Sequence, residues 1–316
     1  MNDKIDLIVP WLNGNDKHWL SLYNSYLQTV SSGDKGISRI RDWDTLRFLL
    51  RSIENNAGWI NKIILCVFDE YQIPDWLNVN NEKLKIVYHK DYIPKSCLPT
   101  YNGLCSSAFL FKIDELSNNF ISCNDDYIFV NKCEESDFFV NNKCVKYYEE
   151  LPDAYNFYNR HRQDAWCGIM ANTIEYKAKI TNSWKNYYTR HVPCSFHKQD
   201  FLNFYETNFN VLEKEFSKYE CKIRQITNLL PEYIVDWIQG DKKDYIQDNN
   251  FYDKYKVIDL CKNTKINEVM DACLHKKCIC LNDQSSGMNV IEFNDMKYKI
   301  VKILSGIFPY KSSFEN

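Results

Sequence analysis

Short apolar runs alternate with amphipathic helical patterns through the first 130 residues of this chain. Runs typical of buried strands occupy residues 5–9, 63–68, 84–88 and 120–130. Helical patterns lie between them at residues 43–57 and 102–116. Strands that alternate with helices pair in parallel and carry the helices on both faces of the sheet. The order therefore predicts an α/β fold built on a mostly parallel sheet.

Beyond about residue 150 the chain changes to longer polar and aromatic segments. Helices are expected at residues 163–180, 199–216 and 229–239. We expect this mostly helical half to cover the ligand edge of the sheet. Residues 1–150 would form the α/β core, and residues 151–316 would complete the site within one catalytic unit.

Charge and hydropathy exclude several classes of protein. A net charge of −3 and a pI near 6.1, without a dense basic run, argue against nucleic-acid binding. No stretch approaches 18 uncharged apolar residues, and the first residues lack the pattern of a secretory signal. A cytoplasmic protein is expected. The segment at residues 296–310 mixes apolar residues with lysines, which fits a docked terminal helix or contact with an anionic membrane surface.

Thirteen cysteines are scattered along the chain, mostly in apolar contexts. Most are expected to be small core side chains in a reducing compartment. One group near the C-terminus offers zinc ligands but lacks a pair of C-x₂-C knuckles: Cys261, Cys273, Cys278 and Cys280, with His275.

Two adjacent carboxylates, Asp125 and Asp126, follow Asn124 between the apolar runs at residues 120–123 and 127–130. Successive side chains of a strand point to opposite faces, so both acids reach one ligand only where the chain turns out of the sheet. That arrangement predicts a Mg²⁺ site at the sheet edge, where nucleotides bind in α/β folds. An ordinary Asn-Asp turn is the alternative.

Other polar groups suit phosphate chemistry. Arg39, Arg41 and Asp42 precede a helical pattern with Arg47 and Arg51, and arginine forks bind phosphate in a bidentate way. An exposed helix face with ion pairs would explain them equally.

His191 and Arg224 are two further candidate site residues. His191 stands two residues before Pro193 in an extended context that projects its ring. Arg224 lies four residues before Asn228, so a helix would place both on one face. A structural histidine and a surface charge are the alternatives.

Taken in order, these groups resemble the Stealth family of sugar-phosphate transferases. This family includes bacterial capsular polysaccharide phosphotransferases and the catalytic core of an N-acetylglucosamine-1-phosphotransferase. The matching segments are IDLIVPWLNGND at residues 5–16, RIRDW at 39–43, LPTYN at 98–102, NDD at 124–126, RHVP at 190–193, and more loosely Arg224 with Asn228. The resemblance covers nearly the whole chain.

The resemblance implies a Rossmann-like fold of the nucleotide-sugar transferase type. It also implies transfer of a hexose-1-phosphate or N-acetylhexosamine-1-phosphate from a nucleotide sugar, UDP-sugars favoured, to a glycan hydroxyl in capsule synthesis. A phosphodiester forms and a nucleoside monophosphate leaves. The metal would be Mg²⁺ or Mn²⁺. Contact with the inner membrane surface is a further option, and the oligomeric state is open.

The same resemblance assigns roles to site residues. Asp126, with Asp125, would hold the metal or position the acceptor, and Asp126, His191 and Arg224 would be catalytic. The residues that would hold the nucleotide and pyrophosphate are Trp11, Asn13, Arg39, Asp42, Arg47 and Asn102.

Two positions depart from the family pattern. Ser107 stands where family members carry a glutamate, and Cys194 stands where a polar ring or amide is common. Loss of a carboxylate removes a possible metal ligand or base. Two other functions therefore stay open: a conventional metal-dependent glycosyltransferase, and a nucleotide-sugar-binding protein with impaired turnover.

Overall fold

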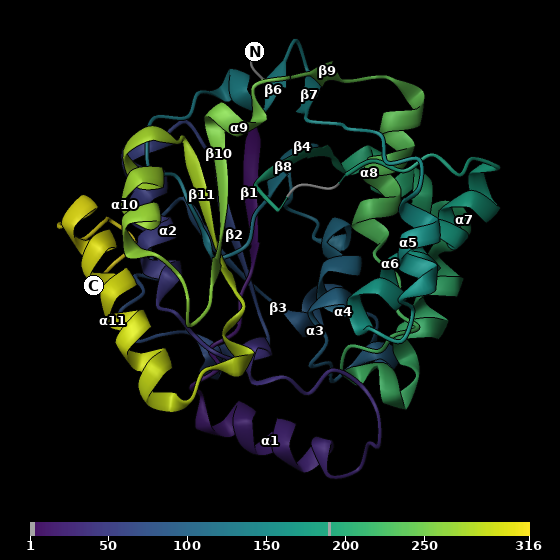
Figure 1. Ribbon diagram of the computed structural model, residues 1–316, viewed down its shortest axis with the longest axis horizontal. Coiled ribbons are helices and arrows are strands. Elements are labelled where there is room, and N and C mark those ends of the chain that lie inside the picture. Colours follow the sequence, from purple (N-terminus) through teal and green to yellow (C-terminus); the bar gives the residue numbers. More distant parts are fainter. Residues whose placement is uncertain (1–3, 189–190) are drawn as a thin grey trace.

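The computed structural model describes residues 4–188 and 191–316 and is built around a five-stranded sheet (Figure 1). Its strand order is β3-β2-β1-β4-β8. The strands are β1 (Ile5–Pro10), β2 (Ile63–Val67), β3 (Leu84–Tyr88), β4 (Asn119–Ser122) and β8 (Cys194–His197). The first four are parallel, and β8 pairs antiparallel with β4. The predicted mostly parallel sheet is confirmed, and β8 shows that both halves of the chain contribute to it.

Helices cover both faces of this sheet, so the central strands β1 and β2 are buried on both faces. Leu7 and Val9 of β1 belong to the core formed with α2 (Thr45–Asn56). Ile8, between them, belongs to the opposite core. That core is formed with α4 (Gly103–Ala108), α6 (Ala165–Thr181), α7 (Lys198–Ser217) and α8 (Pro231–Lys242). The alternation follows from the two-residue period of a strand.

The apolar run at residues 120–130, expected to be one strand, is broken by a turn. β4 ends at Ser122, and the amide of Tyr127 donates to the carbonyl of Asn124 at 3.2 Å. The chain then continues as β5 (Tyr127–Ile128), which pairs antiparallel with β11 (Cys278–Asp283). The single-strand prediction is wrong because Asn-Asp-Asp favours a turn and the apolar flanks bury in different sheets.

A second sheet of order β10-β11-β5 lies beside α2. β10 (Tyr255–Leu260) and β11 are parallel, with α10 (Ile266–His275) between them in the chain. The prediction of a mostly helical second half missed this unit. Only three side chains of β10 are buried, so its sequence lacks the continuous apolar run that marks a central strand. A small third sheet contains β6 (Phe139–Val140), β7 (Lys143–Lys146) and β9 (Ile246–Gln247).

The expected helices are present, with one shortened. The helix expected at residues 102–116 ends at Ala108 and continues as a 3₁₀ turn at Leu110–Lys112. The buried side chains of Phe109, Leu110 and Phe111 all need the core there, which a regular helical face does not allow. The remaining helices are α1 (Lys17–Leu27), α3 (His89–Tyr92), α5 (Ala154–Arg160), α9 (Phe251–Lys254) and α11 (Val290–Ile307).

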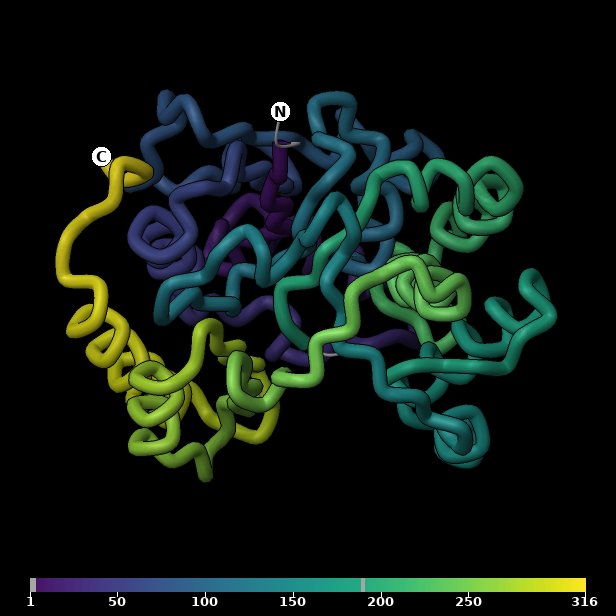
Figure 2. The backbone as a smooth tube through the Cα atoms, turned by 90° about the horizontal axis from the view of Figure 1, so that it is seen from above, coloured from purple at the N-terminus to yellow at the C-terminus, as the bar shows by residue number. Residues whose placement is uncertain are grey.

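The C-terminal helix α11 is docked on the protein. Met296, Ile300 and Leu304, one helical turn apart, are buried in the core shared with α2. The tail beyond it runs along the molecule (Figure 2), and Glu315 forms a β-bridge with Leu77. The docked interpretation is therefore confirmed for this stripe. Within residues 4–188 and 191–316, no helix has the length and apolar character needed to cross a membrane.

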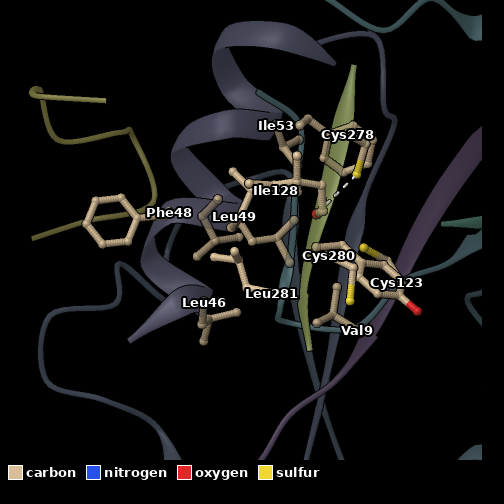
Figure 3. Close-up of a cluster of buried hydrophobic side chains, with 14 of the residues drawn as sticks. Val9, Leu46, Phe48, Leu49, Ile53, Cys123, Ile128, Cys278, Cys280 and Leu281 are labelled. Atoms are coloured by element: carbon tan, nitrogen blue, oxygen red, sulfur yellow. Dashed lines mark hydrogen bonds between the residues drawn. The ribbon is translucent and has the colours of Figure 1, made fainter. Parts of the chain in front are cut away.

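The cysteines behave mostly as core side chains. Cys123, Cys278 and Cys280 pack with Val9 and Leu281 beside α2 and β11 (Figure 3). The group weighed as a possible zinc set near the C-terminus is not brought together among the described residues: His275 is exposed, while Cys273, Cys278 and Cys280 are buried. Residues on alternating strand positions and a helix end are held apart by the βαβ geometry.

Candidate active site

A cavity of about 1320 Å³ lies at the carboxyl ends of the parallel strands. Trp11 follows β1, Phe68 follows β2, His89 follows β3 and residues 124–126 follow β4 along its wall. The ends of β10 and β11 line it as well. Parallel strands all present their carboxyl ends at one edge, so loops distant in sequence meet there.

Asp125 and Asp126 sit in the turn between the two sheets and line this cavity. The Thr45 hydroxyl at the start of α2 donates to Asp125 Oδ2 at 3.1 Å. Asp126 Oδ1 is buried and has no hydrogen-bond partner. Burial raises the pKa of both carboxyls, and Asp125 adds to the effect on Asp126. A buried carboxylate oxygen without a donor fits a cation ligand.

Two further carboxylates, Asp259 and Asp283, reach the cavity from the second sheet. Asp283 ends β11; its Oδ1 accepts from the Ser285 amide at 2.7 Å, while its Oδ2 is buried without a partner. Asp259 accepts from Asn282 at 2.6 Å. The sequence analysis missed both acids. Asn282-Asp283 follows the apolar run at residues 278–281 just as Asn124-Asp125 follows its run, and this repeated pattern was the available signal.

His191 lies just before β8 and lines the same cavity. Its Nε2 is 3.2 Å from the amide nitrogen of Asn124, and its ring meets that of Tyr127 edge-on at 5.4 Å. Burial lowers its pKa, an effect that Asp259 opposes and Arg39 reinforces. The structure thus brings His191 to the acidic turn. Arg190, its neighbour in the family motif, falls outside the described residues.

Arg39 and Arg224 supply positive charge to the cavity wall. Burial, and to a smaller extent the positive charge of Arg39 nearby, lower the pKa of Arg224 to about 10. Arg39 pairs with Asp34 at 3.2 Å and is 41% exposed. Two arginines close enough to repel form a surface suited to binding phosphates, in a cavity that carboxylates also line.

Arg224 is held by a hydrogen-bonded loop and not by the helix that the sequence analysis expected. The amide nitrogen of Asn102 donates to Asn228 Oδ1 at 2.8 Å and to the Cys221 carbonyl at 3.0 Å. Asn102 Oδ1 also caps α4 by accepting from the Leu104 amide. Asn102 lines the cavity, but its polar atoms already position the Arg224 loop.

The other predicted nucleotide contacts divide into two groups. Trp11 and Asp42 line the cavity, and the indole nitrogen of Trp11 is buried without a partner. Asn13 does not line it; its Oδ1 accepts from the Asn15 amide at 3.1 Å. Arg47 does not line it either, because its guanidinium stacks over Trp76 at 4.8 Å. Asn13 and Arg47 are therefore not brought to the cavity in this structure.

Arg41 also has a structural role, as does Gly14 on the segment that packs against Ile40. Arg41 donates to the Ser285 hydroxyl at 2.7 Å and to the Met288 carbonyl at 2.9 Å, which fixes the segment after Asp283. Gly14 makes room for the opposite segment, since a Cβ there would lie 1.5 Å from the Ile40 carbonyl oxygen. These contacts shape the wall that carries Arg39.

Ser107 lines the cavity on α4, so the position of the missing family glutamate faces the site. A different carboxylate, Glu232 at the start of α8, lines the same cavity. Burial raises the pKa of Glu232, partly offset by the Ser122 hydroxyl. The cavity therefore holds a further, half-buried acid that no sequence motif marked.

Comparison with known proteins finds similarity to capsular polysaccharide phosphotransferases. Residues 39–147 match Stealth protein CR2, conserved region 2. The capsular polysaccharide phosphotransferase WcwK of Streptococcus pneumoniae is 27% identical over 99% of this chain and 98% of its own length. The capsular polysaccharide phosphotransferase SacB of Neisseria meningitidis serogroup A is 28% identical over 99% of this chain, which spans 57% of that protein. The capsular polysaccharide phosphotransferase CpsJ of Streptococcus thermophilus is 37% identical over 46% of this chain and 63% of its own length.

Among solved structures, the apo-form glycosyltransferase GlyE of Streptococcus pneumoniae TIGR4 is similar with a TM-score of 0.40 and 10% identity. It covers 98% of this chain and 65% of the other. The sheet and cavity define an α/β protein with a polar site at the carboxyl edge of its parallel strands. The chain is thus similar to Stealth proteins over conserved region 2, and to capsular polysaccharide phosphotransferases over 99% or more of its length.

Proposed function

We propose that this protein is a phosphotransferase that moves a sugar-1-phosphate from a nucleotide sugar to a glycan hydroxyl in capsule synthesis. One observation carries the proposal: a single cavity is lined by the carboxylates Asp125, Asp126 and Asp283 and by the guanidinium groups of Arg39 and Arg224. Similarity to named capsular phosphotransferases supports the same reaction class.

In this reaction the acceptor oxygen attacks the β-phosphorus, and the bond from that phosphorus to the bridging oxygen breaks. The nucleoside monophosphate leaves with the bonding electron pair. Arg224 and Arg39 would stabilise the charge on the phosphoryl oxygens. His191 would take the proton of the attacking hydroxyl, since burial lowers its pKa and favours the neutral ring.

A divalent cation, Mg²⁺ or Mn²⁺, fits the carboxylates of the cavity. Asp126 and Asp283 each have a buried oxygen without a hydrogen-bond partner, and Asp125, next to Asp126 in the turn, lines the same cavity. Carboxylate oxygens are the ligands that hard cations prefer. The cation would neutralise diphosphate charge when bound. Trp11 would donate its free indole N–H to the nucleotide, for which a UDP-sugar is the proposed donor, and Asp42 would line the same part of the site.

Location at the cytoplasmic face of a membrane is also proposed. Val290 and Ile291 open α11 with 69% and 80% of their surfaces exposed. Exposed apolar residues at a helix start suit shallow contact with lipid. Co-sedimentation with anionic vesicles, lost in Ile291→Ser, would support this contact; equal sedimentation of both proteins would contradict it.

The reaction is tested with UDP-, GDP- and CDP-sugars, Mg²⁺ and glycan acceptors, separating nucleoside mono- from diphosphate by chromatography. Monophosphate release is expected, reduced at least about 100-fold by Asp126→Asn and by His191→Gln. The exposed Asp271→Asn is the matched control and should keep full activity. Diphosphate release would instead identify a glycosyltransferase, and donor binding without release would identify the impaired binding protein.

A further inference from the structure

A second set of potential metal ligands lies at the acidic turn. It consists of Asp126, His191 and Cys280. One carboxylate oxygen, one imidazole nitrogen and the thiol sulfur lie within 4.8 Å of one another. The three residues come from the turn after β4, the segment before β8 and strand β11. Within residues 4–188 and 191–316, no other group of three His, Cys, Asp or Glu side chains is gathered this closely.

The chemistry of this set differs from that of a magnesium site. Mg²⁺ takes oxygen ligands, whereas nitrogen, sulfur and one carboxylate oxygen together are typical of Zn²⁺. Zinc bonds of about 2.0 to 2.3 Å in a tetrahedron place ligands about 3.5 Å apart. Closing the set from 4.8 Å therefore needs a movement of about 1 Å, within the reach of side-chain rotation.

Two observations indicate that these three side chains are arranged to bind a cation. Asp126 Oδ1 is buried and has no partner. The Cys280 thiol, fully buried, donates toward Asp126 Oδ2 at 3.7 Å, so its sulfur already faces the carboxylate. The proposed phosphoryl transfer makes no use of this thiol. Figure 3 shows Cys280 on β11 two residues after Cys278, whose sulfur instead faces the Ile279 carbonyl.

We propose that Asp126, His191 and Cys280 bind Zn²⁺ and that this binding inhibits the enzyme. The thiol releases its proton to solvent, the thiolate joins the carboxylate and the imidazole, and the fourth position stays open to water. With zinc bound there, Asp126 is not available to bind Mg²⁺. The His191 ring is likewise not available to take the proton of the acceptor hydroxyl. The binding stands by itself, while the inhibition rests on the proposed function.

Binding is tested with Co²⁺, which takes zinc sites and gives a thiolate-to-cobalt charge-transfer band when sulfur is a ligand. The whole protein should show this band, and Zn²⁺ should abolish it. Cys280→Ser should lose the band, whereas Cys278→Ser, buried on the same strand, should keep it. His191→Ala should weaken cobalt affinity at least about tenfold. Circular dichroism confirms that each variant is folded.

A band that persists in Cys280→Ser, or its absence from the unsubstituted protein, would overturn the zinc site. Inhibition is read as the zinc concentration that halves the Mg²⁺-dependent rate of each protein. This concentration should rise at least about tenfold in Cys280→Ser relative to Cys278→Ser. Equal inhibition of both would overturn the inhibitory role. Because the cobalt spectrum needs no turnover, an inactive preparation would count against the proposed reaction without changing the binding result.

Discussion

Arg51 and Glu315 form a bidentate ion pair that ties helix α2 to the C-terminal tail. Arg51 Nε donates to Glu315 Oε1 and Nη2 to Oε2, both at 2.7 Å. The two side chains are 10% and 2% exposed. Arg51 also donates to the Phe308 carbonyl at the end of α11. The pair therefore fastens the last helix to the helix that carries Thr45 and its contact with Asp125.

Replacing Glu315 by Gln should destabilise the protein, because a buried guanidinium would lose its counter-charge. The expected loss is about 3 kcal/mol in the free energy of unfolding, measured by urea denaturation. Lys143 and Asp244 form an exposed pair with side chains 50% and 73% exposed, so Lys143→Ala should change the same quantity by less than about 1 kcal/mol. Similar losses in both variants would show that the tail is not fixed by this pair.

Stability should fall as the pH drops from 6.5 toward 4, in part through His89. Burial lowers the pKa of His89 from 6.5 to about 4, so in that range the unfolded chain binds a proton that the folded protein does not. Between pH 7 and pH 5 this group should remove about 2 kcal/mol of stability. Above pH 6.5 it should contribute no pH dependence.

The measurement is urea denaturation of His89→Gln at several pH values. This variant should lose that part of the slope, while the exposed His275→Gln should keep it. An unchanged slope in His89→Gln would assign the pH dependence to other groups.

Asp283→Asn should weaken binding of Mg²⁺ or Mn²⁺ at least about tenfold, because one oxygen of the proposed ligand set becomes an uncharged amide. Calorimetry of metal binding in the absence of donor gives the affinity. Asp295→Asn, exposed on α11, is the matched control. Unaltered affinity in Asp283→Asn would place the metal elsewhere in the cavity.

The Asn102→Asp substitution should displace Arg224 indirectly, through the loop between Cys221 and Asn228. The new carboxylate oxygen would face Asn228 Oδ1, at a position where an amide now donates at 2.8 Å. Loss of this buried contact should cost about 2 kcal/mol in stability and raise the donor KM about tenfold. Asn203→Asp on the exposed face of α7 should alter neither. A lower stability with an unchanged KM would show that the loop does not position Arg224 for the donor.

Strands β1, β2 and β3 and helix α2 could be predicted because each carries a pattern of the correct period in an uninterrupted segment. The turn at Asn124 could be predicted as a turn, but not that β5 would leave the sheet. That departure depends on β11, which lies more than 150 residues away and whose apolar run spans only residues 278–281.

The candidate site divides in the same way. Asp126, His191, Arg39 and Arg224 were found from their sequence contexts and all line the cavity. Arg47 and Asn13 came from the same sequence contexts but do not line the cavity, since their contacts with Trp76 and with the Asn15 amide are decided by packing. Local sequence indicates which residues suit phosphate chemistry, whereas the relative position of distant loops decides which of them reach one ligand.

The turn at Asn124 also makes the site a joint between two separately paired sheets. Asp126 leaves the first sheet, and its carbonyl accepts from Leu281 of the second at 2.9 Å. A cation or diphosphate held by both Asp126 and Asp283 would act as a clasp across that joint. Local opening of either sheet would then have to release the ligand, so donor binding would slow amide exchange in β4 and β11 together. A ligand bound in the cavity would thus couple the local opening of the two sheets to each other.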